Sequence, residues 1–459
     1  MKFKVLANQF LNTINRLNYI VPASSTLPIL TNIKFDLKGN NLTLQATDLE
    51  IFMSHTLSVN GERDGELIAP AKELLSLIRA LSYHSEISIR VPDLSPEVVP
   101  DALLNSTVFS EKFKCDFAKK TILLSGIMTE DEKRELIELA GTDNLKSALE
   151  DLFEKQSREF SKISFNVSVD EKKRMMLKTV NGRYVLACSA SDDFPGPQET
   201  DEFRKIEFKD TPLARYLGKI IHTVSSNEIK RNMTGVLFDI RKSELRFVGT
   251  DGFRLGKYTK TNFKLKNQQE EKFIVPLRTC NLIIRINKTG KSVLEYSDKH
   301  IKVTINSTVL YSKLIDERFP NYESVIPKDN DKKLKISKKD LKLALNRALV
   351  FTDPITKKVK MEIKNTSLIL RSDNPEKGGE SEETIDCSFI AEGAQEADFD
   401  TTPFIISFNA QYLVECINQI DTEDMILTFS TPSKASIAYP TEQAEYENYM
   451  ELVMPVRVI

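Results

Sequence analysis

The sequence contains no tryptophan and only 12 tyrosines among its 459 residues. Proteins that hold single-stranded nucleic acid without sequence preference stack the bases on exposed aromatic side chains, so this composition argues against such a platform. The net charge is only −2 at pH 7, which argues against a surface coated evenly with nucleic acid. It leaves open a protein whose 64 lysine and arginine residues gather on one face.

Cysteine and histidine are also scarce. The cysteines form no CxxC pair, and we interpret them as reduced, mostly buried thiols of a cytoplasmic protein. The four histidines lie far apart without HExxH spacing, so the sequence predicts no metal centre. No apolar run approaches the roughly 20 residues of a membrane span. The first residues also lack the apolar core of a signal peptide, so we expect no membrane partner.

Motifs of common enzyme classes are missing. The sequence has no P-loop, no GxSxG and no cysteine–histidine pair. The alternative is an enzyme in which the carboxylates of Asp48, Glu50 and Asp251 hold a divalent metal for phosphoryl transfer. However, Asp48 and Asp251 occupy equivalent positions in two copies of a repeat, which favours a structural role such as capping a turn. We therefore predict a protein that is not an enzyme and needs no cofactor.

That repeat is a β-hairpin pattern that occurs three times. Its copies are "IKFDLKGNNLTLQATDLEI" from Ile33, "GVLFDIRKSELRFVGTDGFRLG" from Gly235 and "VKMEIKNTSLILRSDNPE" from Val359. A constant offset of 203 residues relates the first two copies, and a further 123 residues lead to the third. The turn of the third copy differs, because Asp373 and Pro375 stand at its end. An internal repeat of this kind is stronger evidence for the overall fold than any single local motif.

The segments beside each hairpin repeat as well. Apolar residues with a helical period, such as Leu213, Leu217, Ile220 and Ile221, predict a helix before each hairpin and a second helix after it. The helical segments begin near Leu6, Thr211 and Ser337, and near Ala69, Val275 and Phe408. Further strands follow each second helix. The predicted fold class is therefore α+β, with three repeated domains that each pack two helices on antiparallel sheets.

The repeat sets the expected domain boundaries, which are residues 1–204, 205–332 and 333–459. The first domain is longer than the others by about 75 residues, and the excess lies at about 84–160, which has no counterpart in the other copies. A proline-rich stretch there precedes two predicted helices, which begin at Thr129 and are separated by Gly141 and Thr142. We interpret this segment as a small subdomain inserted in a loop, where insertions are tolerated. The sequence assigns it no role.

Several stretches resemble one family, the bacterial sliding clamp or β subunit of DNA polymerase III. They are "MKFKV" at the start, "TLPIL" at Thr26, "ATDLE" at Ala46, "TDGFRL" at Thr250, "SKLIDERFPNYESVIP" at Ser312, "RSDNPE" at Arg371 and "YMELVMPVRVI" at Tyr449. The resemblance implies a head-to-tail homodimer that closes into a ring of six domains around double-stranded DNA, without sequence preference. Its implied role is processivity, and its implied partners are the replicative DNA polymerase, the clamp loader and other proteins with clamp-binding peptides.

The resemblance also implies that helices line the hole and that their basic residues contact DNA phosphates. Such contacts carry no sequence information and allow sliding. The alternative for each residue is an ordinary solvated side chain. Ser24 stands where the family has a basic residue before "TLPIL", which weakens the contact expected from that loop. The candidates are Lys72, Arg79, Lys219, Lys230, Arg278, Arg285, Lys339 and Arg347.

A second implied site is an apolar pocket in which partner proteins dock a short peptide, with a few polar groups to fix its register. For Leu255 and Val325 the alternative is plain core packing. Phe253 replaces the family's histidine and Ser324 a basic residue, so we expect a partner motif shifted toward apolar contacts. The residues carried over are Met233, Thr250, Gly252, Phe253, Arg254, Leu255, Pro320, Val325, Asn409, Tyr412, Met454, Pro455, Val456 and Arg457.

The third implied site is the seam between the two copies. It would place Tyr184 and Leu186 of one chain against Val350 and Phe351 of the other, although all four could equally be core residues of their own domains. An alternative function is a ring scaffold that binds peptides and no DNA. Retention on circular DNA would separate the two functions, and metal-dependent turnover would indicate an enzyme.

Overall fold

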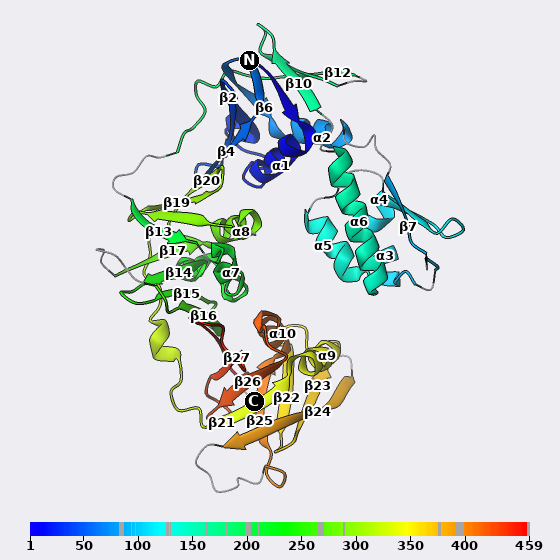
Figure 1. Cartoon of the computed structure of the whole chain (residues 1–459). Helices are drawn as coiled ribbons and strands as arrows, with labels where there is room; N and C mark the ends of the chain where they lie inside the picture. The colour runs from blue at the N-terminus through cyan, green and yellow to red at the C-terminus, as the bar shows by residue number, and fades with distance from the viewer. Residues whose placement is uncertain are drawn as a thin grey trace. The chain divides into compact units, whose positions relative to one another are not determined.

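The computed structural model describes residues 1–81, 87–92, 94–96, 98–124, 128, 130–160, 164–179, 182–197, 203–209, 211–263, 270–287, 290–374, 378–391 and 399–456 (Figure 1). Two compact units make up the chain. Unit 1 contains residues 1–199 and 306–311, and unit 2 contains residues 200–305 and 312–459. Within the described ranges, no helix is long and apolar enough to cross a membrane.

The first domain, in unit 1, packs two helices on antiparallel strands. Helices α1 (Ala7–Asn18) and α2 (Ala71–Leu81) each bury one apolar face, which includes Phe10 and Ile14 on α1 and Leu74 and Ile78 on α2. One sheet has the order β12-β11-β10-β1-β5, with bounds β1 (Lys2–Leu6), β5 (Asn60–Arg63), β10 (Ser164–Val169), β11 (Arg174–Lys178) and β12 (Arg183–Ala187). Four more strands pair in the order β4-β3-β2-β6, with bounds β2 (Asn32–Lys38), β3 (Asn41–Thr47), β4 (Ile51–Ser58) and β6 (Gly65–Pro70).

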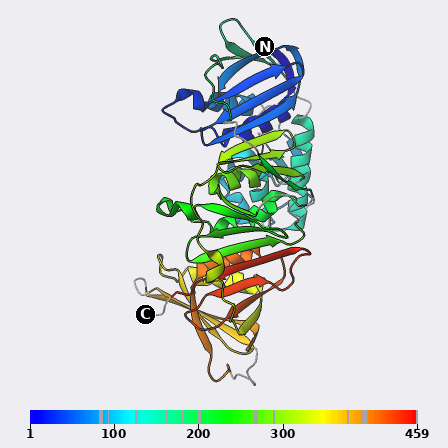
Figure 2. The same ribbon diagram turned by 90° about the vertical axis from the view of Figure 1, so that its left-hand side faces the viewer.

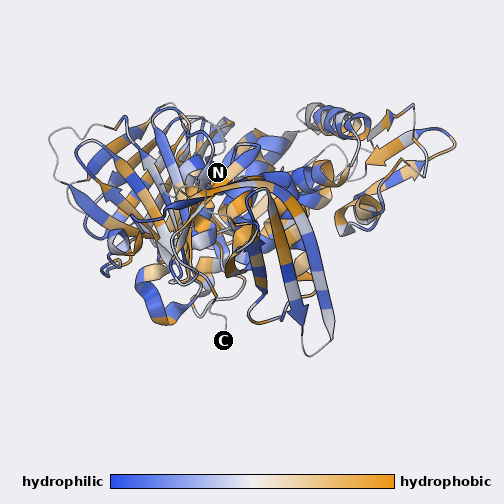
Figure 3. Cartoon of the chain, turned by 90° about the horizontal axis from the view of Figure 1, so that it is seen from below, coloured by the Kyte–Doolittle hydropathy of each residue, from blue (hydrophilic) through white to orange (hydrophobic). Residues whose placement is uncertain are grey.

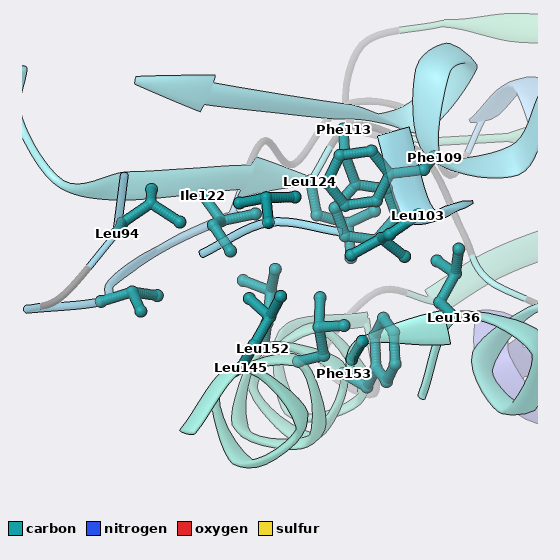
Figure 4. Close-up of a cluster of buried hydrophobic side chains, with 14 of the residues drawn as sticks. Leu94, Leu103, Phe109, Phe113, Ile122, Leu124, Leu136, Leu145, Leu152 and Phe153 are labelled. Carbon is teal, nitrogen blue, oxygen red and sulfur yellow. The ribbon is translucent and has the colours of Figure 1, made fainter. Parts of the chain in front are cut away.

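The insertion is a small α+β subdomain with a core of its own. Its elements are β7 (Ile87–Arg90), α3 (Asp101–Leu104), α4 (Thr107–Lys112), β8 (Phe113–Asp116), β9 (Thr121–Leu124), α5 (Glu130–Leu139) and α6 (Asp143–Phe160). The core packs Phe109 and Phe113, stacked 4.9 Å apart, with Phe153 and leucines of α5 and α6 (Figure 4). Helices α5 and α6 confirm the two expected helices, although Thr129 lies outside the described residues. The sheet β7-β9-β8 was not predicted, because strands of four residues give too short an alternation to detect.

Unit 2 contains two further domains that share one antiparallel sheet of twelve strands. Its order is β17-β14-β15-β16-β28-β27-β26-β21-β24-β23-β22-β25. The central domain has β13 (Arg204–Phe208), α7 (Leu213–Gly218), β14 (Gly235–Ile240), β15 (Leu245–Thr250), β16 (Arg254–Lys260), β17 (Glu271–Pro276), α8 (Leu277–Ile286), β18 (Ser292–Tyr296) and β19 (His300–Ile305). The next strand in the chain, β20 (Thr308–Lys313), lies mostly in unit 1. The third has β21 (Lys332–Ser337), α9 (Lys338–Leu349), β22 (Lys358–Ile363), β23 (Ser367–Asn374), β24 (Gly379–Ala391), β25 (Phe404–Asn409), α10 (Ala410–Gln419), β26 (Asp424–Phe429), β27 (Ser436–Pro440) and β28 (Glu447–Val453).

The three hairpins of the repeat pair in the same register. Phe35 lies opposite Leu44 in the first copy, and Phe238 lies opposite Phe247 in the second. In the third copy Met361 lies opposite Leu370 at the equivalent position, and all six side chains are buried. The strands alternate between hydrophobic and hydrophilic residues (Figure 3). Because one buried face fixes the register of a strand, equal spacing of apolar residues gives the same pairing each time.

One predicted helix is shorter than its apolar pattern indicated. Leu213, Leu217 and Ile220 are buried as the stripe predicts, but α7 ends at Gly218 and a 3-10 turn, η3 (Ile221–Thr223), follows. Glycine is unfavourable inside a helix by about 1 kcal/mol relative to alanine, and the β-branched residues that follow it restrict χ1. Helix α9 behaves as predicted, because the Ser337 hydroxyl caps it by accepting the Asp340 backbone N–H at 3.3 Å.

Asp48 and Asp251 have the same structural role in their two copies. Oδ1 of Asp48 accepts backbone N–H groups two and three residues ahead, at 3.0 and 2.7 Å, and Oδ1 of Asp251 does the same at 2.8 and 3.0 Å. The residue after each aspartate has a positive φ, 77° at Leu49 and 91° at Gly252. The two carboxylates are therefore turn caps, and this supports the structural interpretation over a metal site.

Candidate functional site

Strand β28 joins the central and third domains. It pairs with β16 over seven residues, from Arg254 opposite Val453 to Lys260 opposite Glu447, and its other edge pairs with β27. In Figure 2 this strand, in red, lies beside the green strands of the central domain. Tyr449, Leu452 and Val453 are buried in it. The last strand therefore holds two domains together.

The segment after β28 lies across the predicted peptide site. The backbone N–H of Met454 donates to the carbonyl of Phe253 in the central domain at 2.9 Å. Two residues later, the N–H of Val456 donates to the carbonyl of Ser407 in the third domain at 2.8 Å. This segment therefore contacts both domains. Arg457 lies outside the described residues.

Three predicted pocket residues expose large apolar side chains. Phe253 is 61% exposed, Val325 is 53% exposed and Met454 is 39% exposed. Such side chains near a domain seam are typical of protein interaction sites when they form a patch. Met233, Pro320, Tyr412, Pro455 and Val456 are half-buried. Together these residues can offer apolar contacts to a peptide.

Other predicted pocket residues support the site from beneath. Leu255 packs in a core cluster with Leu237 and Val248, as the alternative interpretation of Leu255 expected. The Thr250 hydroxyl donates to the Arg254 carbonyl at 2.7 Å. Oδ1 of Asn409 caps α10 by accepting two backbone N–H groups, from Gln411 and Tyr412. These residues shape the site rather than offer surface to a ligand.

Arg254 is the main polar link across the seam. It is only 8% exposed, and its Nη1 donates to Oε2 of Glu415 on α10 at 2.5 Å. Its Nε lies 3.1 Å from Oδ2 of Asp251, and Nη2 donates to the His222 carbonyl. The guanidinium also stacks over the Tyr412 ring at 4.4 Å. Each of its three nitrogens has a hydrogen-bond or ion-pair partner within the protein. Arg254 therefore stabilises the join between the central and third domains and is not available to bind a ligand.

Electrostatics keep both members of this pair charged. Burial alone would lower the pKa of Arg254, but the hydrogen bond and the charge of Glu415 raise it above the usual value. Burial alone would raise the pKa of Glu415, but the hydrogen bond from Arg254 lowers it below the usual value. The pair is therefore ionised at neutral pH.

A second polar link, which the sequence analysis missed, is centred on Glu451 of β28. Its side chain is fully buried, with Oε2 2.8 Å from Nε2 of His222 and accepting the Tyr449 hydroxyl at 2.9 Å. His222 lies in the central domain, so this contact also spans the seam. The signal in the sequence was a single carboxylate inside the apolar run "YMELVMP". A charge in such a run indicates a buried partner.

A third network anchors the loop that carries Pro320 and Val325. The Tyr322 hydroxyl donates to Oδ2 of buried Asp239 at 2.6 Å, and it accepts from Arg241 and Arg246 at 3.2 and 3.0 Å. Arg246 also donates to Oε1 of Glu323 at 2.7 Å. Two pocket residues therefore flank a tyrosine that the central domain holds firmly.

Replacing Tyr322 with phenylalanine is expected to destabilise the protein by about 1–3 kcal/mol, because Asp239 then loses a buried donor. Chemical denaturation, followed by far-UV circular dichroism, measures this change. The control is Tyr446→Phe, since Tyr446 is 54% exposed and its change is expected to stay within about 0.5 kcal/mol. Equal stability of the two variants would contradict the assigned role of Tyr322.

Glu323 adds a pH dependence to this network. The hydrogen bonds from Arg246 and Arg241 lower the pKa of Glu323 from 4.5 to about 2. A lowered acid pKa stabilises the fold above the unfolded value, and this contribution is lost as the pH falls from about 4.5 toward 2. The effect is modest, because the Glu323 side chain is about half exposed and solvent screens its ion pairs.

The predicted DNA contacts fall into two groups. Lys72 and Arg79 on α2, Arg278 and Arg285 on α8, and Lys339 and Arg347 on α9 are exposed. Arg79 donates to Oδ1 of Asn15 at 2.9 Å, and Arg347 donates to both oxygens of Glu383 at 2.7 and 2.5 Å. All six lie on helices of their domains, and their contact with DNA stays a prediction.

Lys219 and Lys230 differ from that group. The Lys219 side chain is 12% exposed and its Nζ lies 2.6 Å from Oδ1 of Asp421, which makes it a seam residue. Lys230 lies on a 3-10 segment, η4 (Glu228–Met233), and its Nζ is 3.8 Å from the position that a Cβ on Gly252 would take. It therefore borders the predicted peptide site. Neither lysine lies within a regular α-helix, and a contact of either with DNA stays a prediction.

The residues predicted at the interface between the two copies lie beside unpaired strand edges. Tyr184 and Leu186 are half-buried on β12, which pairs with β11 on one side and has no partner on the other among the described residues. In unit 2, residues 379–386 of β24 pair with β23 on one edge, and their other edge is likewise unpaired among the described residues. Phe351 lies beside Gly379 at the start of β24, since its Cδ1 is 3.3 Å from the position that a Cβ on Gly379 would take. The neighbouring Val350 is 76% exposed. Each unit thus combines a free edge with accessible apolar side chains.

Three repeated domains of paired helices on antiparallel sheets, two of them fused through one sheet, define a clamp-type protein. Models of three domains of the DNA polymerase III beta subunit match the chain in order. The N-terminal domain matches residues 1–112, the central domain residues 207–321 and the C-terminal domain residues 323–457. The chain belongs to this family, the bacterial beta sliding clamps.

Similar proteins cover the whole chain at low identity. The beta sliding clamps of Vibrio cholerae and Escherichia coli K12 are 21% and 22% identical to it, each over 100% of both chains. Among solved structures, the Pseudomonas aeruginosa sliding clamp bound to griselimycin has a TM-score of 0.75 at 19% identity, over 100% of both chains. The Thermotoga maritima beta subunit has a TM-score of 0.72 at 18% identity, again over 100% of both chains. The fold is therefore that of a sliding clamp throughout.

Proposed function

We propose that two copies of this chain close head to tail into a ring that encircles duplex DNA and tethers the replicative polymerase. The ring is not a catalyst and works as a processivity factor. The observation that carries the proposal is the pair of unpaired strand edges, β12 in the first domain and the start of β24 in the third. Two different edges on one chain make a heterologous contact, and such contacts close into rings when the rotation permits. Closure also covers edges that would otherwise promote aggregation.

The charges beside these edges are complementary. Lys178 and Arg183 are exposed on β11 and β12, whereas Glu380 is exposed on β24. Opposite charges on two surfaces favour their encounter and fix their register. Val185 on β12 is 46% exposed and adds apolar surface to the basic edge. We therefore place Tyr184 and Leu186 of one copy near Val350 and Phe351 of the other.

In this ring the exposed basic residues of α2, α8 and α9 contact phosphates without reading sequence. Phe253, Val325 and Met454 offer the apolar surface on which polymerase and other partner peptides dock, with Lys230 at its border. The proposed domain boundaries remain residues 1–204, 205–332 and 333–459, with the insertion at about 84–160. The same site also fits a ring that binds peptides without DNA, and the following experiment separates the two.

Protein loaded by a clamp loader onto nicked circular DNA is expected to stay bound in 1 M salt and to be released when the circle is linearised. Enclosure resists salt, whereas phosphate contacts alone weaken steeply as salt rises. Gel filtration of the protein–DNA complex measures retention. Release at high salt from the intact circle would leave the peptide scaffold as the better description.

An edge variant provides the matched test of closure. Val185→Pro places a residue without an N–H on the β12 edge, where pairing with a partner strand needs donors. The solution mass is expected to fall from twice the chain mass of 52.2 kDa to that of one chain, and retention on the circle should be lost. Val185→Ala is the matched control, because it keeps the backbone N–H at the same position, and it is expected to stay dimeric. A Val185→Pro protein that is still dimeric would contradict the assigned seam.

A further inference from the structure

The insertion separates its charges between its sheet and its helices. Residues 112–120, which contain β8 and the turn after it, carry four lysines and one aspartate. Residues 130–160, which contain α5 and α6, carry five basic and ten acidic residues. The subdomain therefore has a positive sheet and negative helices. A packed core of its own holds this arrangement rigidly.

The basic residues share the outward face and the turn of the sheet. Phe113, Ile122 and Leu124 point into the core, so the alternate positions of these strands point outward. Lys114 lies opposite Leu123, and Arg90 lies opposite Thr121, at these alternate positions.

Lys119 and Lys120 are exposed in the turn between β8 and β9. Lys119 lies 3.4 Å from Asp116, which is the one acidic residue in residues 112–120. Among the residues that the structure describes, Arg90, Lys114 and Lys120 make no ion pair. The face therefore keeps a positive charge that the described residues do not neutralise.

The insertion is attached beside the helices that the proposed function assigns to DNA. It follows α2, which carries Lys72 and Arg79, and returns through α6 to β10. Helix α6 also contacts α1. The chain connections thus hold the insertion near the α1–α2 pair.

We propose that this positive face, defined as Arg90, Lys114, Lys119 and Lys120, binds the phosphate backbone of the DNA that the ring encloses. The inference rests on the proposed function. Strands lie about 4.8 Å apart, so three strands span about 10 Å, and a duplex presents about one charge per 1.7 Å of its axis. The face can therefore meet several phosphates at once. Long basic side chains along neighbouring strands and their turn suit a row of phosphates, because such contacts carry no sequence information.

The test compares two variants of the full-length protein with equal changes in charge. The face variant is Arg90→Ala, Lys114→Ala, Lys119→Ala and Lys120→Ala, and the control variant is Lys133→Ala, Arg134→Ala, Lys146→Ala and Lys155→Ala on the acidic helices. Fluorescence anisotropy with a linear duplex, from 50 to 200 mM salt, gives the slope of log K against log salt. Each lost phosphate contact reduces the slope by about 0.9. We expect the face variant to lose about 3 units of slope and the control less than about 1.

The outcomes separate this inference from the proposed function. If the face variant binds the duplex with the slope of the control, the inference is wrong. A polyglutamate peptide that competes for the face while the duplex slopes stay equal would overturn it in favour of an acidic protein partner. Retention on nicked circular DNA is expected to persist in the face variant, because enclosure holds the ring. If the wild-type protein is not retained on nicked circular DNA, the proposed ring is contradicted, whatever the slopes of log K against log salt show.

Discussion

Replacing Arg254 with alanine is expected to destabilise unit 2 by about 3–5 kcal/mol. The change removes one partner of a buried ion pair and leaves Glu415 without its counter-charge, which is among the most costly single substitutions. It also removes the stacking on Tyr412. The protein has no tryptophan, so urea unfolding is best followed by tyrosine fluorescence and far-UV circular dichroism.

A double-mutant cycle gives the control for this prediction. Glu415→Gln, alone and combined with Arg254→Ala, isolates the energy of the pair from the effect of each side chain. We expect a coupling energy of at least about 1 kcal/mol, since contacting residues in one network couple by about 0.5–3 kcal/mol. A cost below about 1 kcal/mol for Arg254→Ala, with no coupling, would show that the seam does not depend on this pair.

The second large effect is expected at the peptide surface. The double variant Phe253→Ala and Val325→Ala should weaken binding of the polymerase peptide that the proposed function assigns to this surface by more than 30-fold, because each hot-spot side chain contributes about 2 kcal/mol or more. Both side chains are largely exposed in the free protein, so stability should change by less than about 0.5 kcal/mol each. Isothermal titration calorimetry measures the affinity.

Ile390→Ala is the matched control, since Ile390 is also a large apolar residue, 54% exposed, but lies on β24. Its affinity should equal that of the wild-type protein. Unchanged binding by the double variant would remove Phe253 and Val325 from the peptide site. A fall in affinity that accompanies a general loss of stability would instead indicate a structural role for them.

Local patterns predicted the repeated elements well. Equal spacing of Phe35, Phe238 and Met361 anticipated three hairpins, and the structure gives them one register. The match between Asp48 and Asp251 correctly indicated a turn cap in each copy. These features depend on residues within one hairpin, so their physical cause is contained in a short stretch of chain.

Predictions failed where a short pattern was ambiguous. The apolar stripe after Thr211 continued past Gly218, so the helix was expected to run to Val224, whereas α7 ends at Gly218 and Lys219 is its C-cap. The sheet of the insertion was missed because its strands have only four residues each. In both cases the apolar spacing alone was a weak guide, because it registers neither the cost of Gly218 inside a helix nor strands of only four residues.

The sequence by itself determined the threefold repeat, the fold class, the insertion and the family, because these follow from periodic residues and ordered motifs. Only the tertiary structure decided how the central and third domains are joined. Arg254 and Glu415 are 161 residues apart, and His222 and Glu451 are 229 residues apart. A buried charge needs a partner, because an unpaired charge in the interior is too costly. The sequence does not indicate which distant residue will be that partner.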